Sequence, residues 1–390
     1  MAHAKPDETI NPIGPQEHRE GPDAKELKRR ELIVNMGPQH PSTHGVLRVI
    51  LELEGETVVN ATPVLGYLHR CFEKICESWT YVQIVPFCDR NDYVAAMLDE
   101  HAMCLAIERL MDLEVPERAE YIRVIVTELN RIASHLLWLG TFGLDLGAVT
   151  PFLYAFRDRE LIIDLFQRLT GARLFYSYLR IGGVRNDLPD GFLKELEDFL
   201  DYLDRVMGEY DALLTNNPIF VARTRGVGVL RPEDALRSSA SGPFLRASGV
   251  RWDLRKNRPY SIYNRFDFEV PVGTSGDCYD RYLVRLGEIR QSSRIIYQAL
   301  RDIPDGPVRA DVPKVIKPPE GRGYSRIESP RGELGVYLVS DGSATPYRVY
   351  WRAPSFYNLQ LLPAISRGYR MADMTAIIGS IDIVLGEIDR

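Results

Sequence analysis

Apolar residues recur at three- and four-residue spacing through the middle of the chain, which is the periodicity of helices that bury one face. This spacing predicts helices over residues 95–111 and 117–139. Thr150 and Pro151 are typical of an N-cap followed by proline at the first helical position, and they predict a third helix that ends near Thr170–Gly171. The centre of the chain is therefore predicted to be helical.

A longer apolar seam runs from Phe192 to Leu214, where apolar residues repeat at seven-residue spacing. Such a repeat indicates a helix that packs along another helix. We expect its partner to be the helix predicted over residues 277–300. One more helix is predicted near residues 371–378.

Short apolar runs bounded by turn residues predict strands towards both ends of the sequence. Residues 31–64 are expected to form two or three strands, with a turn at Gly55–Thr57. Residues 335–340 and 347–352 are expected to pair as a hairpin around the Asp341–Gly342 turn. These strands lie on either side of the helical centre in the sequence.

The remaining segments are interpreted as irregular. The Pro- and Gly-rich segment 303–330 is interpreted as a loop, and residues 1–30, which show no apolar period, as an extended N-terminal arm. The predicted fold class is α+β, with a central helical bundle flanked by small N- and C-terminal β elements. Residues 31–390 contain no internal repeat or low-complexity tract and are predicted to form a single domain.

Composition narrows the classes of protein and partner. The chain is 45% hydrophobic and 26% charged, and its net charge of −6 provides no basic field for binding nucleic acid. Its five cysteines, an odd number, and the absence of an apolar leader near Lys5 and Asp7 favour a reduced, cytosol-facing protein. We therefore expect no nucleic-acid partner.

One segment is long and apolar enough to require comparison with a membrane span. Residues 132–156 contain no Lys or Arg and are rich in Leu, Phe and Trp. However, His135, Asp145 and Pro151 interrupt the segment, and a charge at the centre of a bilayer is costly. The segment is interpreted as a helix and a turn inside a large core, and membrane contact is expected only through partners.

The stretch Met36–Gly45 is the most unusual feature of the sequence. Its ten residues include two histidines, two prolines and two glycines, and strand-like apolar runs flank it. Proline fixes φ and glycine permits a close approach of the backbone, so this loop can hold an imidazole in one place. From residue types alone, an ordinary turn with incidental histidines is the better interpretation.

Several common chemistries are excluded by spacing. Gly226–Gly228 and Gly321–Gly323 lack the third glycine of a dinucleotide fingerprint, and the sequence contains no Walker lysine motif. The spacing of Cys71 and Cys76 differs from that of zinc or iron–sulfur pairs, and no second pair complements them. The cysteines are interpreted as small buried apolar residues.

A series of motifs in order along residues 31–390 resembles the 49 kDa (or D) subunit family of respiratory complex I, NADH:quinone oxidoreductase. These motifs are Met36–Gly45, Gly66–Arg70 with Phe72–Lys74, Asp89–Tyr93, Leu144–Phe152, Gly182–Val184, Trp252–Lys256, Gly276–Tyr282 and Gly386–Arg390. The resemblance implies a fold like that of the large subunit of nickel–iron hydrogenases. It also implies a role in reducing quinone to quinol at the end of an electron-transfer chain.

Hydrogenase activity itself is the rival hypothesis, and the residues present argue against it. Hydrogenases of this type hold their metals with two C-x-x-C pairs, whose positions correspond here to Asp92, Ala95, Val384 and Glu387. Nickel and low-spin iron need thiolate ligands, and none of these four residues supplies one. We therefore expect no metal centre, and the former metal cavity is expected to be the site of the quinone headgroup.

The resemblance assigns roles to particular residues. It implies that His44 and Tyr93 bind the two carbonyl oxygens of the quinone and that Asp145 pairs with His44. Imidazolium and phenol groups can each donate a hydrogen bond and then a proton. Without the resemblance, His44 would be an ordinary loop donor, Tyr93 an aromatic residue at a helix start and Asp145 a local cap.

Two further positions carry expectations. Arg70 corresponds to an arginine near the terminal [4Fe–4S] cluster of a neighbouring subunit, and the alternative is an exposed ion pair with Glu73 or Glu77. Many relatives carry a histidine near that cluster that couples its redox potential to pH, and Phe175 takes that position here. Because phenylalanine binds no proton, we expect a lower cluster potential, which favours menaquinone over ubiquinone as the acceptor.

The resemblance also implies an assembly at the cytoplasmic face of the bacterial plasma membrane. The chain is expected to bind no cofactor itself, with quinone as the substrate and with FMN and the [4Fe–4S] cluster in partner subunits. The expected partners are subunits B, C, I and H, of which B is the small iron–sulfur protein and H lies in the membrane. Two alternatives stay open, namely the same subunit in a ferredoxin-fed quinone oxidoreductase and a non-catalytic scaffold with a vestigial pocket.

Overall fold

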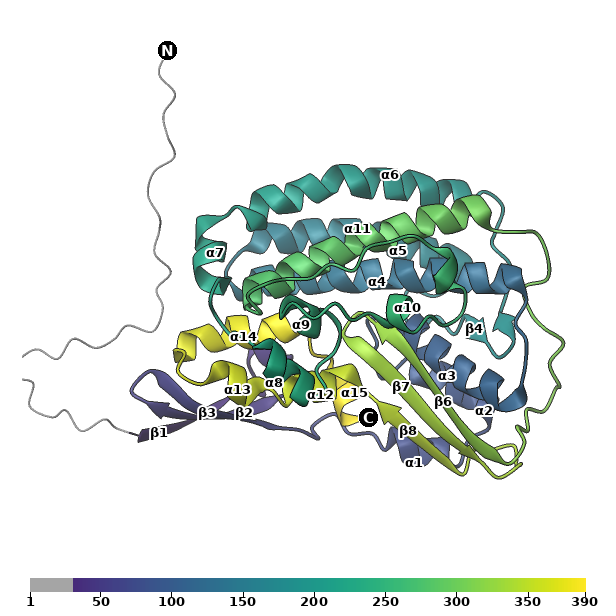
Figure 1. Cartoon of the computed structure of the whole chain (residues 1–390), viewed down its shortest axis with the longest axis horizontal. Coiled ribbons are helices and arrows are strands. Elements are labelled where there is room, and N and C mark those ends of the chain that lie inside the picture. The colour runs from purple at the N-terminus through teal and green to yellow at the C-terminus, as the bar shows by residue number, and fades with distance from the viewer. Residues whose placement is uncertain (1–30) are drawn as a thin grey trace, which may run out of the picture.

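Five long helices form the centre of the computed structural model, which describes residues 31–390. They are α3 (Ala96–Met111), α4 (Glu117–Asp145), α5 (Val149–Thr170), α6 (Phe192–Tyr210) and α11 (Cys278–Asp302). Helix α4 packs against both α5 and α11, and α6 packs against the same two helices; Figure 1 shows α4, α5, α6 and α11 side by side. The arm predicted for residues 1–30 lies outside the described residues.

The predicted central helices and the one predicted helix pair are confirmed, with adjusted ends. The apolar seam of α6 packs on α11 as expected, and its last turn, Asp211–Thr215, is a π-helix. The prediction of Thr150 as an N-cap is wrong, because α5 begins at Val149 and its N-cap is Ala148. The cause is the length of α4, which runs to Asp145 and leaves only three residues for the connection.

The N-terminal strands form an antiparallel sheet in the order β1 (Glu31–Met36), β2 (Arg48–Glu54) and β3 (Thr57–Val64). The register pairs Met36, the last residue of β1, with Val49 near the start of β2. The histidine-bearing loop therefore connects these two strands at the same end of the sheet. The loop contains a single helical turn, η1 (Pro41–Thr43). This sheet confirms the strands predicted for this part of the chain.

A second antiparallel sheet contains β6 (Gly321–Ser329), β7 (Gly332–Ser340) and β8 (Arg348–Arg352). The hairpin of β7 and β8 is confirmed, but the interpretation of residues 303–330 as a loop is wrong for 321–329, which form β6. A Cβ on Gly323 would lie 2.7 Å from Leu110 Cγ of α3. Packing on α3 therefore decides the conformation here, and local sequence carries little signal for such packing.

Short elements connect these layers. They are β4 (Leu179–Arg180), β5 (Gly183–Val184), α1 (Phe72–Cys76), α2 (Tyr81–Cys88), α7 (Pro218–Thr224), α8 (Pro232–Arg237), α9 (Gly242–Ala247), α10 (Leu254–Asn257), α12 (Pro354–Leu359), α13 (Leu362–Ser366), α14 (Met374–Ile381) and α15 (Leu385–Asp389), with the 3-10 turns η3 (Tyr263–Arg265) and η4 (Met371–Asp373). The last predicted helix corresponds to η4 and α14. The mixture of a helical bundle and small sheets confirms the α+β class.

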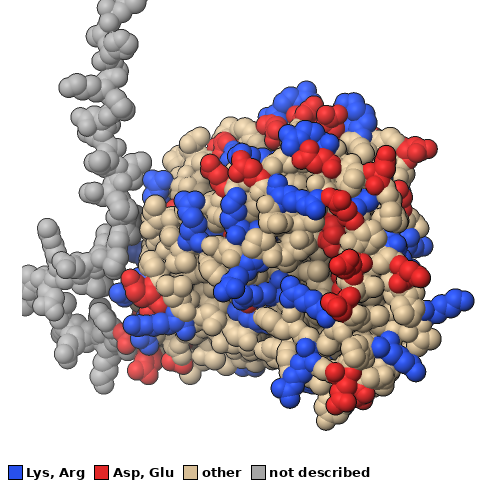
Figure 2. All heavy atoms as spheres, turned by 45° about the vertical axis from the view of Figure 1, so that its right-hand side comes forward, with Lys and Arg blue, Asp and Glu red and all other residues tan. Residues whose placement is uncertain are grey.

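The apolar residues of both sheets and the bundle join in one buried cluster. Residues 132–156 form the end of α4, a turn and the start of α5, as predicted. Within residues 31–390, no helix is long and apolar enough to cross a membrane. On the face in Figure 2, acidic and basic side chains are interspersed.

Candidate functional site

The histidine-bearing loop between β1 and β2 is fixed by contacts within the loop. The Thr43 hydroxyl donates to the carbonyl oxygens of Pro38 and His40, at 3.0 and 2.9 Å. Gly37 has a φ of +80°, and a Cβ at that position would lie 2.5 Å from Thr43 Oγ1. Only glycine allows this approach, so the loop delivers His44 to a defined place at the end of η1.

His44 is the C-cap of η1 and has left-handed backbone angles, with φ 55° and ψ 18°. Such a conformation is uncommon for a residue other than glycine. His44 keeps an accessible edge, yet desolvation by the surrounding protein lowers the pKa of its imidazole. Asp382 opposes this change and raises the pKa, whereas Arg331 lowers it. Asp382 and Arg331, the two charges that act on the pKa of His44, both belong to a buried ion cluster.

Tyr93 lies half-buried in the turn between α2 and α3. Its ring packs on Gly386 of α15, where an added Cβ would lie 3.2 Å from Tyr93 Cε1. Burial raises the pKa of the Tyr93 hydroxyl, Asp92 adds to the increase, and Arg331 and Arg70 oppose it. Tyr93 thus keeps its proton at neutral pH and can donate a hydrogen bond to a ligand.

Arg331 is a charged group that influences the pKa values of both His44 and Tyr93. It is buried in the turn between β6 and β7. Its Nη1 donates to Asp92 Oδ2 at 2.9 Å, and its Nη2 lies 3.5 Å from Asp382 Oδ1. Arg331 lowers the pKa of His44 and opposes the raised pKa of Tyr93, so both side chains lie within the electrostatic influence of the same cluster.

Carboxyl groups outnumber guanidinium groups in this cluster, which buries Asp92, Asp99, Asp382 and Glu387 with Arg285 and Arg331. Glu387 Oε1 accepts from the Ser355 N–H at 3.0 Å, and its Oε2 has no hydrogen-bond partner among the described residues. Burial, together with the charge of Asp92, raises the pKa of Glu387 to about 8. Burial likewise raises the pKa of Asp99 well above its usual range. Glu387 is therefore mostly protonated at neutral pH.

Asp145, the last residue of α4, lies near the loop without bonding to His44. Burial raises the pKa of Asp145 to about 6, and a hydrogen bond from Ser42 opposes the increase. The carboxylate also approaches Gly379 of α14, where an added Cβ would lie 3.3 Å from Asp145 Oδ2. Within residues 31–390 no hydrogen bond or ion pair joins Asp145 to His44. The predicted pairing of these two residues stays a prediction.

Arg70 takes no part in the ion pairs considered as its alternative role. Its Nη2 donates to the carbonyl oxygen of Arg90. Glu73 instead pairs with Arg348 at 2.9 Å, and Glu77 pairs with the same arginine at 3.2 Å. Arg70 therefore remains exposed beside the segment that carries Tyr93. Its role near a partner's cluster stays a prediction.

Sequence reasoning missed the two arginines and the aspartate at the centre of the site. Arg331 follows a proline in a tight turn, a position typical of surface residues, and Arg285 lies on a helix rich in charged residues. Asp382 ends α14 in a left-handed conformation, with φ 63°. The only available signal was indirect, since the resemblance assigns Asp92 and Glu387 to positions that bind metal in hydrogenases.

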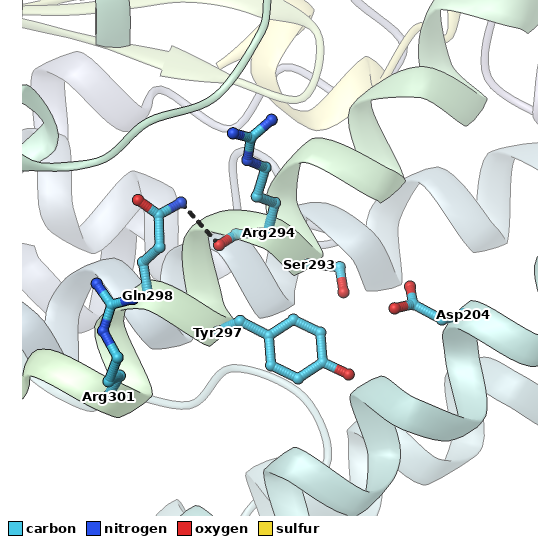
Figure 3. Close-up of a pocket in the computed structure, with 6 residues that line it drawn as sticks. All are labelled: Asp204, Ser293, Arg294, Tyr297, Gln298 and Arg301. Atoms are coloured by element: carbon cyan, nitrogen blue, oxygen red, sulfur yellow. Dashed lines mark hydrogen bonds between the residues drawn. The ribbon is translucent and has the colours of Figure 1, made fainter.

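Two hollows on the described surface lie outside this cluster. One, of about 820 Å³, is lined by the first half of the loop, Asn35–His40, and by Glu56, Met371, Ala372 and Thr375. The other, of about 510 Å³, lies between α6 and α11, where Asp204 faces Ser293 and Tyr297 (Figure 3). In Figure 1 helices α6 and α11, whose residues line the second hollow, lie at the top of the bundle, whereas β1, which leads to the loop, lies at the bottom.

The fold and the cluster define an α+β protein with a buried ionic site close to a histidine-bearing loop and a tyrosine. Comparison with known proteins identifies the family. The family described as respiratory-chain NADH dehydrogenase, 49 kDa subunit, matches residues 145–321 and 313–390. The chain belongs to this family, as the resemblance predicted.

Curated relatives extend the match over nearly the whole chain. The NADH-quinone oxidoreductase D subunit of Desulforamulus reducens is 58% identical over 363 residues, which cover 93% of this chain and 99% of the relative. The protein of the same name from Bacillus mycoides is 54% identical over 364 residues, covering 93% of this chain and 100% of the relative. A third, from Bacillus cereus, is 53% identical over 364 residues, with the same coverage of 93% and 100%.

Proposed function

We propose that this chain is the quinone-site subunit of a proton-pumping NADH:quinone oxidoreductase. The observation that carries the proposal is the shared electrostatic neighbour of His44 and Tyr93, the buried guanidinium of Arg331. A quinone headgroup has a carbonyl oxygen at each of two opposite positions, and it needs one hydrogen-bond donor for each. A histidine and a tyrosine that face one cluster supply these two donors.

The chemistry of reduction suits these two side chains. Quinone takes up two electrons and two protons to become quinol, with the electrons arriving from a [4Fe–4S] cluster in the neighbouring small subunit. Tyr93 gives its hydroxyl proton to one reduced oxygen, and protonated His44 gives its ring proton to the other. The raised pKa of Tyr93 ensures that its proton is present before reduction and favours rapid reprotonation from water afterwards.

The pocket is proposed to descend from the metal cavity of a hydrogenase large subunit, without its metal. Asp92 and Glu387 stand at two of the former thiolate positions, while Ala95 and Val384 have no donor atoms. Asp92 is engaged by Arg331 at 2.9 Å, and a cation in this place repels a metal ion. The residues therefore suit a polar organic headgroup better than nickel and iron.

The assembly follows from the same proposal. The small iron–sulfur protein, B, provides the terminal cluster close to Arg70, and subunits C, I and H complete the surroundings. FMN and NADH belong to other subunits of the peripheral arm, at the cytoplasmic face of the bacterial plasma membrane. Quinone reaches the site from the membrane through a passage shared with subunits B and H, so membrane contact is made through partners.

Photolabelling of the native complex tests the proposal. A photoreactive quinone is illuminated with the purified complex, and the labelled peptides of this chain are identified by mass spectrometry, with excess unlabelled quinone as the competitor. We expect competed label on peptides containing the Met36–Gly45 loop or the Asp89–Tyr93 turn. Label confined to other subunits, or label that quinone does not displace, would contradict the assignment and favour the scaffold alternative.

The same preparation identifies the electron donor. Mass spectrometry of the intact complex detects a flavin-bearing subunit and any quinone that co-purifies. We expect an FMN-bearing NADH-oxidising subunit. A complex without such a subunit that accepts electrons from reduced ferredoxin would support the ferredoxin-fed alternative, with the same site in this chain.

A further inference from the structure

A third hollow, of about 400 Å³, lies between α2, β4 and the loop that precedes β6. Figure 1 shows this loop passing β4 and α2 along the right-hand edge of the molecule. Much of the wall is apolar, since Val85, Ile181 and Ile316 line it and each is no more than 4% exposed. No member of the ion cluster near His44 and Tyr93 lines this hollow, so it is separate from the site described above.

The Gly182–Val184 motif, which the candidate site does not use, holds one wall of the hollow in place. The Ala310 N–H donates to the Gly182 carbonyl oxygen at 2.8 Å. A Cβ on Gly183 would overlap the carbonyl oxygen of Val308, and only glycine allows the backbone to approach so closely. The motif therefore fixes the loop before β6, which supplies most of the polar side chains of the hollow.

Three cationic side chains line the hollow without a carboxylate that compensates them. Within residues 31–390, the side chains of Arg309 and Lys314 form no ion pair or hydrogen bond, and the Arg180 guanidinium donates only to two neutral oxygens, each at 3.1 Å. Asp311 also lines the hollow but forms no ion pair with them. Because the whole chain has a net charge of −6, this local excess of positive charge is unusual for its surface, and it favours an anionic partner.

Apolar side chains extend from the hollow onto the surface. Val82 of α2 is 50% exposed, and Val315, between two residues that line the hollow, is 60% exposed. A small inorganic anion would compensate the cations and leave this apolar surface uncovered, whereas a protein segment with acidic and apolar side chains would cover both. Because the chain belongs to a family of respiratory-chain subunits, a neighbouring subunit is available as the source of such a segment.

We propose that this cationic hollow, defined by Arg180, Arg309 and Lys314, docks an acidic, partly apolar segment of a neighbouring subunit. Carboxylates of the segment pair with the three cations and remove their mutual repulsion. Burial of the exposed Val82 and Val315 adds a hydrophobic contribution. The inference concerns assembly and goes beyond the proposed function, since it does not depend on which chain binds quinone.

Site-specific crosslinking in the native complex tests the inference. Val82 is replaced by the photoreactive amino acid p-benzoylphenylalanine, with Val315 as the second position, and crosslinked peptides of the purified, illuminated complex are identified by mass spectrometry. We expect one major crosslink, to a peptide of another subunit that carries at least two carboxylates. A crosslink to a neutral or basic peptide, to lipid or to residues 1–30 of this chain, or the absence of any crosslink, would overturn the proposal.

Charge reversal provides a second measurement. Arg309→Glu combined with Lys314→Glu should reduce the fraction of complexes that keep the crosslinked subunit through a salt wash by about tenfold. The matched control is Arg237→Glu combined with Arg251→Glu, two exposed arginines outside the hollow, which changes the net charge equally and should leave that fraction unchanged.

Replacing the crosslinked carboxylates by lysine should restore retention of the subunit in the charge-reversed variant, which a general loss of stability would not allow. Unchanged retention in this variant, an equal loss in the control, or no rescue by lysine would contradict the docking site. Quinone reduction per intact complex should stay normal in both variants. The proposed function is tested separately by photolabelling with quinone, so either proposal can fail without the other.

Discussion

At the scale of single residues, Phe175 places an apolar ring at a position where the family resemblance predicts a titratable histidine. The guanidinium of Arg90 lies 4.4 Å above the centre of this ring. Phe175 has a left-handed φ of 56°, so the backbone turns sharply to place the side chain. A permanent charge over an aromatic ring thus takes the place of the group that the resemblance predicts would gain and lose a proton.

This replacement predicts a cluster potential that does not respond to pH. Redox titration of the terminal [4Fe–4S] cluster, followed by electron paramagnetic resonance, should give one midpoint across the pH range in the native complex. Phe175→His should introduce a midpoint that falls as pH rises, because oxidation then releases a proton. A native midpoint that already falls with pH would show that another group titrates there, and the argument for menaquinone as the acceptor would fail with it.

Residues differ in how far the sequence reveals their roles. His44 and Tyr93 stand in compact motifs, so the family resemblance could assign roles to them, and these roles stay predictions. Arg331 and Asp382 lie in a turn and at a helix end, and only the folded chain brings them to 3.5 Å from each other. A buried ion pair between positions that distant in sequence leaves no local pattern, so sequence reasoning overlooked both residues.

At the scale of secondary structure, α15 supports the turn that carries Tyr93. Gly386 on this helix contacts the turn so closely that an added Cβ would overlap the carbonyl oxygen of Asn91 and lie 2.9 Å from that of Arg90. These are backbone atoms, which cannot move away from an added Cβ as the end of a flexible side chain can. The position of Tyr93 therefore depends on a glycine in the first turn of α15.

Gly386→Ala should displace the turn and with it the tyrosine ring. We expect quinone reduction to fall at least tenfold in the assembled complex, with the affinity for quinone weakened, while NADH oxidation by an artificial acceptor persists. The matched control is Gly208→Ala on α6, where an added Cβ meets no atom within 4 Å. That variant should be neutral or more stable by about 0.5–1 kcal/mol. Normal quinone kinetics of Gly386→Ala would contradict this account of Tyr93.

Element prediction succeeded where periodicity was strong and failed where tertiary packing decides. The seven-residue apolar repeat of α6 correctly predicted a helix, because the buried face of a helix sets this spacing of apolar residues. Strand β6 begins with Gly321 and Gly323, residues typical of loops, and is held by pairing with β7 and by packing on α3. Neither stabilising contact can be recognised in the segment itself.

At the scale of the whole molecule, a chain of buried ion pairs crosses the bundle beyond the site. Glu288 accepts from Arg246 at 2.7 Å and contacts His135 at 3.0 Å, and Arg246 continues to Glu328 at 2.6 Å. These side chains are almost completely buried. Each charge in the chain is compensated by its neighbours, so the loss of one member leaves others uncompensated.

Glu288→Gln should therefore destabilise the fold by about 3–5 kcal/mol, measured by urea unfolding of the isolated chain. The pKa of Glu288 is held far below its usual range, with Arg246 the largest favourable contribution. The stabilisation is present above the ordinary glutamate pKa and should be lost as pH falls towards the folded-state value. Glu209→Gln, in an exposed pair with Arg157 at 3.1 Å, should cost less than about 1 kcal/mol. Equal effects of the two substitutions would contradict this account.

The central claim, that this chain binds and protonates the quinone headgroup, is tested most directly by Tyr93→Phe in the assembled complex. The substitution removes one hydroxyl and keeps the ring that packs on Gly386. We expect quinone reduction to fall by about 10²–10⁴-fold, the usual contribution of a positioned acid, while NADH oxidation by an artificial acceptor stays normal. Near-normal turnover with quinone in a fully assembled complex would contradict the assignment of the site.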